Sequence, residues 1–214
     1  MKMLNISKAK LIITSIITLI PILVGLILWN QLPDSMVTHW GVGNVPNGWS
    51  SKAMAVFGLP GFLFIIHWVC LLATKADPKS KDINKKLIDL VLWICPLLSV
   101  LLGGVSYSYS LGYKVNVQAV VMIFLGVLFV IIGNYLPKCK QSYTMGIKLP
   151  WTLNDEENWN KTHRLAGKLW VAGGLIMIAT AFVAGAFVSV AVIALMVIIP
   201  TVYSYILYRK KLNS

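Results

Sequence analysis

Apolar residues in this chain gather in long runs, and short polar segments separate the runs. Six runs are long enough to cross a bilayer as helices, at roughly residues 11–32, 53–73, 87–107, 118–136, 165–184 and 187–207. None alternates apolar and polar positions as the strands of a membrane β-barrel do. Because only helices and closed barrels satisfy their backbone in lipid, the pattern predicts an all-α integral membrane protein with six transmembrane helices.

The charges agree with this prediction and orient the helices. Only 12% of the residues are charged, against about 25% in a soluble domain. With the N-terminus inside, all but two of the 19 basic residues fall in inside segments, the exceptions being Lys52 and Lys114. Since basic segments favour the cytoplasmic side, both termini are expected in the cytoplasm. The net charge of +12 then reflects topology and contact with anionic membrane lipids, and no direct nucleic-acid binding is expected.

We expect a single membrane domain with three parts. Residues 1–74 form an N-terminal module with an outer loop at 33–52, residues 75–132 hold the third and fourth helices, and residues 133–214 hold a long polar segment and a helical hairpin. The hairpin is expected to turn at Ala184-Gly185-Ala186, which leaves almost no loop.

The outer loop is rich in residues that break helices. Five prolines and glycines lie within about twenty residues, and Asn47-Gly48 is a tight-turn pair. The loop therefore has a defined shape, and its candidate ligand-binding residues are His39, Trp40 and Trp49. The alternative is that the two tryptophans only anchor the loop at the membrane interface.

The polar segment from Gly133 to Trp170 is the longest interruption of the apolar pattern. Its first part is irregular up to Leu153. Asn154 is expected to cap a helix, with Glu157 three residues later as in a capping box. With no proline before Pro200, this helix is expected to run on into the fifth apolar run.

One face of that helix carries Trp159, His163, Ala166 and Trp170 at spacings of four, three and four residues. This stripe is expected to place an imidazole between two indoles. The face either docks under the helix bundle or has a function of its own, and the periodicity alone does not decide between the two.

The remaining reactive side chains do not form a recognisable site. His39 is expected outside and His163 inside, so the two cannot share a metal ion, and His67 would reach His163 only if the polar segment folds up against the bundle. His67 lies at membrane depth, where a hydrogen-bonded histidine and a functional one are both plausible. No metal-binding spacing or nucleophile motif is present, so no catalytic residue, metal or cofactor is expected.

Several short motifs in the polar segment resemble the signature of the SdpI family of bacterial membrane immunity proteins. They are Gly133-Asn134-Tyr135, the run Gly146-Ile147-Lys148-Leu149-Pro150-Trp151-Thr152-Leu153, Trp159, and Thr162-His163-Arg164. The outer loop, from Leu32-Pro33 through Thr38-His39-Trp40 to Gly48-Trp49, resembles the N-terminal module that often precedes this signature. Two departures stand out: the family commonly has arginine at the place of Lys148 and asparagine near Ser142.

The resemblance implies a multi-pass protein of the bacterial plasma membrane that protects its cell against a secreted, membrane-active peptide toxin, a bacteriocin. It also implies that the protein can hold a transcriptional repressor at the membrane. His39, Trp40 and Trp49 would then meet the toxin outside. The signature residues expected to act inside are Asn134, Gly146, Lys148, Pro150, Trp151, Thr152, Trp159, Thr162, His163 and Arg164.

Two other functions stay open from the residues alone. A membrane-embedded enzyme would use His163 with Glu156 or Glu157 as acid–base groups. A small transporter would use helices that bend at their prolines, but the helices carry almost no paired charge to couple an ion. The resemblance favours a protein that is not an enzyme.

Overall fold

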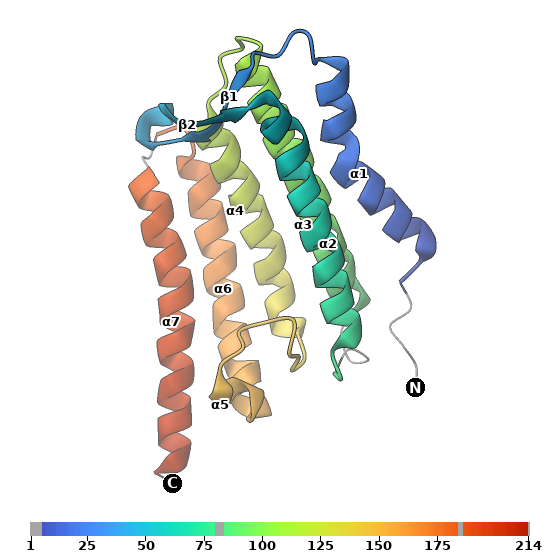
Figure 1. Ribbon diagram of the computed structural model, residues 1–214. Coiled ribbons are helices and arrows are strands. Elements are labelled where there is room, and N and C mark those ends of the chain that lie inside the picture. Colours follow the sequence, from blue (N-terminus) through green and yellow to red (C-terminus); the bar gives the residue numbers. More distant parts are fainter. Residues whose placement is uncertain (1–5, 80–83, 184–185, 214) are drawn as a thin grey trace. The chain divides into compact units, whose positions relative to one another are not determined.

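The computed structural model describes residues 6–79, 84–183 and 186–213, and most of them are helical (Figure 1). The chain divides into two compact units. The first unit comprises Met1–Ala76 and Ile88–Val117, and the second comprises Asp77–Leu87 and Gln118–Ser214. The expected turn at Ala184-Gly185 lies outside the described residues.

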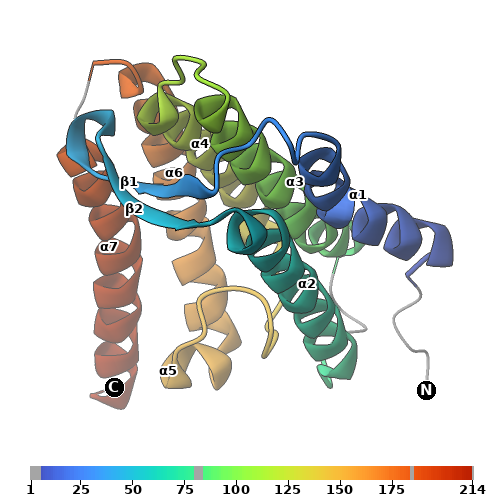
Figure 2. The ribbon, with the colours of Figure 1, turned by 45° about the horizontal axis from the view of Figure 1, so that its top comes forward.

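The first unit consists of three long helices and a β-hairpin. Its elements are α1 (Lys8–Ile27), β1 (Ser35–Trp40), the short turn η1 (Val42–Asn44), β2 (Pro46–Ser51), the π-helical turn η2 (Met54–Gly58), α2 (Leu59–Ala76) and α3 (Lys85–Ser110). Figure 2 shows the two strands side by side, with β2 leading into α2.

The β-hairpin corrects the all-α prediction for the outer loop. β1 and β2 pair antiparallel, with Ser35 opposite Ser51 and irregular register around His39. The sheet was not predicted from the sequence because its strands are short. Its turn uses Gly43 and Asn44, which both adopt positive φ. The same glycines and prolines that exclude a helix are those that a tight hairpin requires.

Side chains fix the hairpin to the rest of its unit. Met36 is fully buried in a cluster with Leu32, Val56 and Tyr107. At the other end, the side chain of Asn44 donates to Val115 O at 2.9 Å and accepts from Val117 N at 2.8 Å. Because both its base and its tip are tied down, the hairpin presents a shaped surface.

Buried polar groups join the three helices of this unit. Thr14 donates to the backbone carbonyl of Lys10, so its oxygen accepts from Nε2 of His67 at 3.1 Å. Ser99 donates to Thr18 O at 2.7 Å, and Tyr107 donates to Pro21 O at 2.9 Å. His67 is thus buried and hydrogen-bonded through Nε2, whereas its Nδ1 has no partner among the described residues.

The second unit contains α4 (Val117–Tyr135), the turn η4 (Leu136–Lys138), α5 (Pro150–Leu153), α6 (Glu156–Thr180) and α7 (Ala186–Leu212). In Figure 1, α4, α6 and α7 run side by side, and α5 lies beside the beginning of α6. The expected continuous helix through the polar segment is confirmed, since α6 runs unbroken from Glu156 into the fifth apolar run.

Glycines let α4 and α6 approach each other closely. A Cβ on Gly126 would lie 2.7 Å from Gly174 O, and a Cβ on Gly167 would lie 2.7 Å from Gly133 O. The two contacts are seven residues apart on each helix. Such small-residue contacts allow backbones to pack tightly in a membrane, where the hydrophobic effect does not drive helices together.

Within the described residues, five helices are long and apolar enough to cross a membrane: Lys8–Ile27, Met54–Ala76, Lys85–Ser110, Val117–Lys138 and Phe187–Leu212. The α6 helix is not one of them because its first half is polar and charged. The sixth span and the orientation of the termini therefore stay predictions.

Candidate functional site

The irregular segment at residues 139–149, which we call the signature loop, wraps around two stacked side chains of α6. The rings of Trp159 and His163 stack with centroids 4.0 Å apart and planes 22° apart. Both side chains are almost fully buried. The indole N–H of Trp159 donates to Cys139 O at the start of the loop, at 2.7 Å. The stack is thus the core around which the loop closes.

The hydrogen bonds of His163 fix its protonation state. Nδ1 lies 2.8 Å from Trp159 O, a group that can only accept, and Nε2 lies 2.9 Å from Ile147 N, a group that can only donate. The proton must therefore be on Nδ1 and the lone pair on Nε2. Burial lowers the pKa of this imidazole, against a smaller rise from the bond to Trp159 O, so the neutral form is favoured.

Gly146 is the point at which the loop touches the stack. Its φ of 103° belongs to the left-handed region that favours glycine. A Cβ there would lie 2.6 Å from Nε2 of His163 and 2.7 Å from the Trp159 ring. Only glycine allows the loop to pass this close.

Asp77 holds the loop from the other side, and sequence reasoning missed it. Its carboxylate accepts from the hydroxyl of Ser142 at 2.6 Å, from the hydroxyl of Thr144 at 2.8 Å, and from the backbone N–H groups of Lys79, Tyr143 and Thr144. Burial raises the pKa of this carboxyl, but these hydrogen bonds outweigh burial and lower it.

The connector around Asp77 looks like a solvated basic link in the sequence. The only local signal was an acidic side chain directly after the end of α2 in a lysine-rich segment. Its partners in the loop are 65 to 67 residues away. No local pattern reveals a contact over that distance.

Cys139 is buried at the start of the signature loop. Its side chain is 5% exposed, and its Sγ lies 3.9 Å from Met145 O. Burial raises the pKa of the thiol to about 11, which leaves it almost entirely protonated and unreactive near neutral pH. All three cysteines are free thiols.

Thr152 connects the loop to α5, and Thr162 belongs to a hydrogen-bond chain between α6 and α7. Thr152 is fully buried, accepts from Leu149 N at 2.9 Å, and donates to the carbonyl of Ile147 at 2.9 Å. Thr162 donates to Asn158, whose amide donates to Ser204 O on α7 at 2.9 Å. Asn158 and Ser204 are further site residues that sequence reasoning missed.

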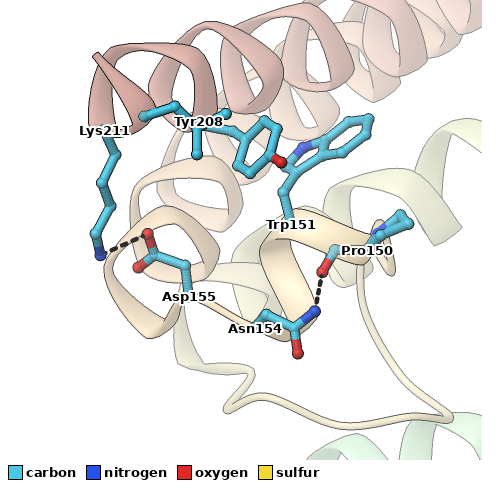
Figure 3. A pocket seen from close by; sticks show the side chains of 7 residues that line it. Pro150, Trp151, Asn154, Asp155, Tyr208 and Lys211 are labelled. Atoms are coloured by element: carbon cyan, nitrogen blue, oxygen red, sulfur yellow. Dashed lines mark hydrogen bonds and ion pairs between the residues drawn. The ribbon is translucent and has the colours of Figure 1, made fainter. Parts of the chain in front are cut away.

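Trp151 ties the short helix α5 to α7. Its indole N–H donates to the hydroxyl of Ser204 at 3.0 Å, and its ring stacks on Tyr208 with planes 23° apart. Beside this pair lies a cavity of about 340 Å³ (Figure 3), lined by Pro150, Trp151, Asn154, Asp155, Tyr208, Lys211 and Leu212.

The expected N-cap of α6 is wrong by one residue. Asp155 caps the helix, and its carboxylate accepts from the N–H groups of Glu157 and Asn158. Asn154 instead closes α5, donating to Pro150 O at 2.8 Å. The side-chain hydrogen bond from Lys211 is the main cause that lowers the pKa of Asp155. Glu157 and Lys161 form an ion pair one turn apart on α6, at 2.6 Å.

Several predicted residues lie apart from the stack. Asn134, Lys148, Pro150 and Arg164 are exposed. Trp170 packs against Phe129 with ring centroids 5.3 Å apart, so the prediction that His163 lies between two indoles is wrong. The helical spacing placed the residues on one face correctly, but Trp170 lies further along α6 than the loop reaches.

The outer candidates lie on the hairpin of the first unit. His39 is exposed and contacts Asn47, and Trp49 is 59% exposed. Trp40 packs edge-on against Tyr109, and its indole N–H is buried without a hydrogen-bond partner among the described residues. The exposed Val42 and Val45 flank the hairpin tip, and sequence reasoning did not single them out.

The geometry does not favour acid–base chemistry at His163. Both ring nitrogens are occupied by backbone groups and the side chain is 1% exposed. Glu156 and Glu157 are exposed in the first turn of α6. A general base needs a free nitrogen within reach of a substrate, whereas this imidazole is positioned to hold a loop.

Comparison with known proteins gives two family matches and one near full-length relative. The model of the SdpI/YfhL protein family matches residues 138–204, and that of a domain of unknown function (DUF1648) matches residues 16–64. The "Immunity protein SdpI" of Bacillus subtilis (strain 168) is 32% identical over 207 residues, which cover 95% of this chain and 98% of that protein. No solved structure matches the chain.

Proposed function

Because the chain belongs to the SdpI/YfhL protein family, we propose that it is an immunity protein that protects its cell against a secreted, membrane-active peptide toxin. The observation that carries this proposal is the similarity to an immunity protein over nearly the whole of both chains. Five apolar helices agree with a multi-pass membrane protein. The protein acts by binding and not by catalysis, which is consistent with the fully engaged nitrogens of His163.

In this proposal the hairpin faces outward and meets the toxin. Its exposed apolar side chains, Val42, Val45 and Trp49, are 76%, 59% and 59% exposed. Exposed apolar side chains on a fixed support are typical of protein interaction sites. His39 and Trp40 complete the proposed contact surface.

The topology proposed for this function has six spans with both termini in the cytoplasm. The α6 helix would be the sixth span, with its polar first half at the inner surface. Its glycine contacts with α4 support this placement, because they shield its weakly apolar face from lipid. A helix with Arg164 and Lys168 near one end can cross if those charges stay at the interface.

The inner surface is the proposed place for a cytoplasmic transcriptional repressor. Tyr143, Lys148 and Arg164 are exposed side chains on or near the signature loop. They are signature or neighbouring positions whose exposed ends make few contacts: Lys148 donates to Thr144 O at 3.4 Å, and the ammonium of Lys79 lies over the Tyr143 ring. An interaction with another protein accounts for them better than a packing role does.

A survival assay tests the proposal. Deletion of the gene is expected to sensitise the cell to its cognate toxin, and the wild-type chain supplied in trans is expected to restore survival. Unchanged survival of the deletion strain would overturn the function.

Single substitutions then separate the two faces. Trp49→Ala is expected to reduce protection at unchanged membrane abundance, whereas Tyr113→Ala removes another exposed aromatic ring, 67% exposed and outside the hairpin, and should protect fully. Full protection by a double variant that carries both Trp49→Ala and Val45→Asp would show that the hairpin is not the toxin site.

A further inference from the structure

The cavity beside Trp151 has a composition that suits a lipid headgroup. Its volume of about 340 Å³ falls in the range of small-molecule sites. The rings of Trp151 and Tyr208 form an aromatic wall, and Asp155 and Lys211 place a carboxylate and an ammonium 3.0 Å apart at its edge (Figure 3). The cavity therefore offers both signs of charge next to aromatic faces.

The position of the cavity along α7 sets its depth in the membrane. Tyr208, Lys211 and Leu212 belong to the end of a helix that is apolar and long enough to span the bilayer. That end carries Arg209, Lys210 and Lys211. Tyrosine, tryptophan and basic residues at the end of a span mark the level of the lipid headgroups. The mouth of the cavity thus lies where phosphate groups lie.

An apolar track leads along α7 to the cavity. Tyr205, Tyr208 and Leu212 follow one another at helical spacing and share one face. Tyr205 is 44% exposed and Leu212 is 61% exposed. This face can carry an acyl chain while the attached headgroup occupies the cavity.

We propose that the cavity binds a glycerophospholipid with a zwitterionic phosphoethanolamine headgroup. Lys211 binds the phosphate, and Asp155 with the aromatic faces of Trp151 and Tyr208 receives the ammonium. A purely anionic headgroup fits less well, because Asp155, Glu156 and Glu157 lie together at the start of α6. Lys211 is the exposed side of its pair with Asp155, so its ammonium faces the mouth of the cavity, where a phosphate would bind.

The experiment uses the purified full-length protein and native mass spectrometry with dioleoyl phosphatidylethanolamine, phosphatidylcholine and phosphatidylglycerol in turn. Phosphatidylethanolamine is expected to be retained best. Lys211→Gln should weaken its binding by about tenfold, and Tyr208→Leu should weaken it as well. Lys210→Gln is the matched control, since Lys210 is an exposed neighbour that does not line the cavity; its binding should stay unchanged.

Three results would overturn the proposal. Equal retention of the three lipids would exclude headgroup recognition, and a preference for phosphatidylglycerol would exclude a zwitterion site. Equal losses in Lys211→Gln and Lys210→Gln would show a diffuse basic surface. Since Lys211→Gln also removes the contact with Asp155, Lys211→Arg is the check on folding, and it should keep phosphatidylethanolamine binding. Loss in Lys211→Arg equal to that in Lys211→Gln would also contradict a charge-based site.

Discussion

At the scale of single residues, the signature loop depends on a glycine without which its closest contact cannot form. Gly146 combines a positive φ with a distance to the buried stack that leaves no room for a Cβ. The two constraints are independent, because strain arises in the backbone and collision arises with Trp159 and His163.

Gly146→Ala is expected to destabilise the loop by more than backbone strain alone, which is on the order of 1–3 kcal/mol. Gly112→Ala is the matched control, because Gly112 also has a positive φ but has no atom within 4 Å of the place where a Cβ would lie. Thermal unfolding of the two purified variants measures the difference. Equal losses would mean that the collision at Gly146 contributes nothing.

His163 is the second residue whose chemistry can be tested directly. Its two backbone partners require the tautomer with the proton on Nδ1, and its lowered pKa makes it less protonated than an ordinary imidazole at the same pH. Nitrogen-15 NMR of histidine-labelled protein is expected to show this tautomer at pH 7.5, and at pH 6.5 a smaller protonated fraction than that of an ordinary imidazole. The His163→Gln spectrum assigns the signal. A ring that is protonated by half or more at pH 6.5 would contradict the geometry.

The lowered pKa of His163 also determines how the stability of the protein changes with pH. Because the folded-state pKa is lower than the unfolded one, the unfolded chain binds more protons between the two values. The contribution of His163 to stability is therefore complete above about pH 6.5 and falls as the pH drops toward the folded pKa. Asp77 has a lowered pKa and loses its contribution only as the pH falls through that lowered value, below its ordinary one, so it does not interfere in this window.

At the scale of elements, the loop is held between Asp77 and the stack on α6. Five hydrogen bonds converge on one carboxylate, and a buried carboxylate that loses its partners is costly. The loop itself has no regular structure before α5. Its shape therefore comes from these contacts and not from local propensity.

Asp77→Ala is expected to release the loop and expose Cys139. In a background in which Cys70 and Cys95 are replaced by alanine, a maleimide should label Cys139 at least about tenfold faster at pH 7.5, because exposure lowers the thiol pKa from about 11 toward its ordinary value. Asp89→Ala, which breaks an exposed ion pair with Lys10, is the control and should leave labelling slow. Unchanged labelling in Asp77→Ala would show that Asp77 does not hold the loop.

The helices could be predicted from the sequence, but the contacts of the site could not. Long apolar runs identify helices because the bilayer imposes their length. The hairpin was missed because its residues serve turns as well as strands, and the cap was misplaced because Asn154 and Asp155 are equally suitable caps. Asp77 was missed because its partners are distant in sequence. The stripe of Trp159 and His163 was predicted, and its role in holding a loop needed the structure.

At the scale of the whole molecule, the number of spans decides which segments share a side of the membrane. The five apolar helices alone put the signature loop and the C-terminus on opposite sides, because only α7 would cross between them. If α6 also crosses, they share one side. Its glycine contacts and its charged beginning both bear on this question.

Single cysteines distinguish the two topologies. In the background in which Cys70 and Cys95 are replaced by alanine and Cys139 is buried, we consider single added cysteines. Tyr143→Cys and Asn213→Cys are expected to react with an impermeant maleimide only after the cells are permeabilised. Val45→Cys on the hairpin is expected to react in intact cells. All three positions are exposed in the structure. Labelling of Asn213→Cys but not of Tyr143→Cys in intact cells would show that α6 does not cross the membrane and that the protein has five spans.

The hydrogen bonds between Asp77 and the signature loop can form only after the loop has been synthesised. Asp77 leaves the ribosome 65 residues ahead of Ser142, which at 5–20 residues per second is a wait of roughly 3–13 s. Before then, of the five hydrogen bonds described above, its carboxylate can form only the one from Lys79 N–H. Burial of this charge by the signature loop therefore has to follow translation of that loop.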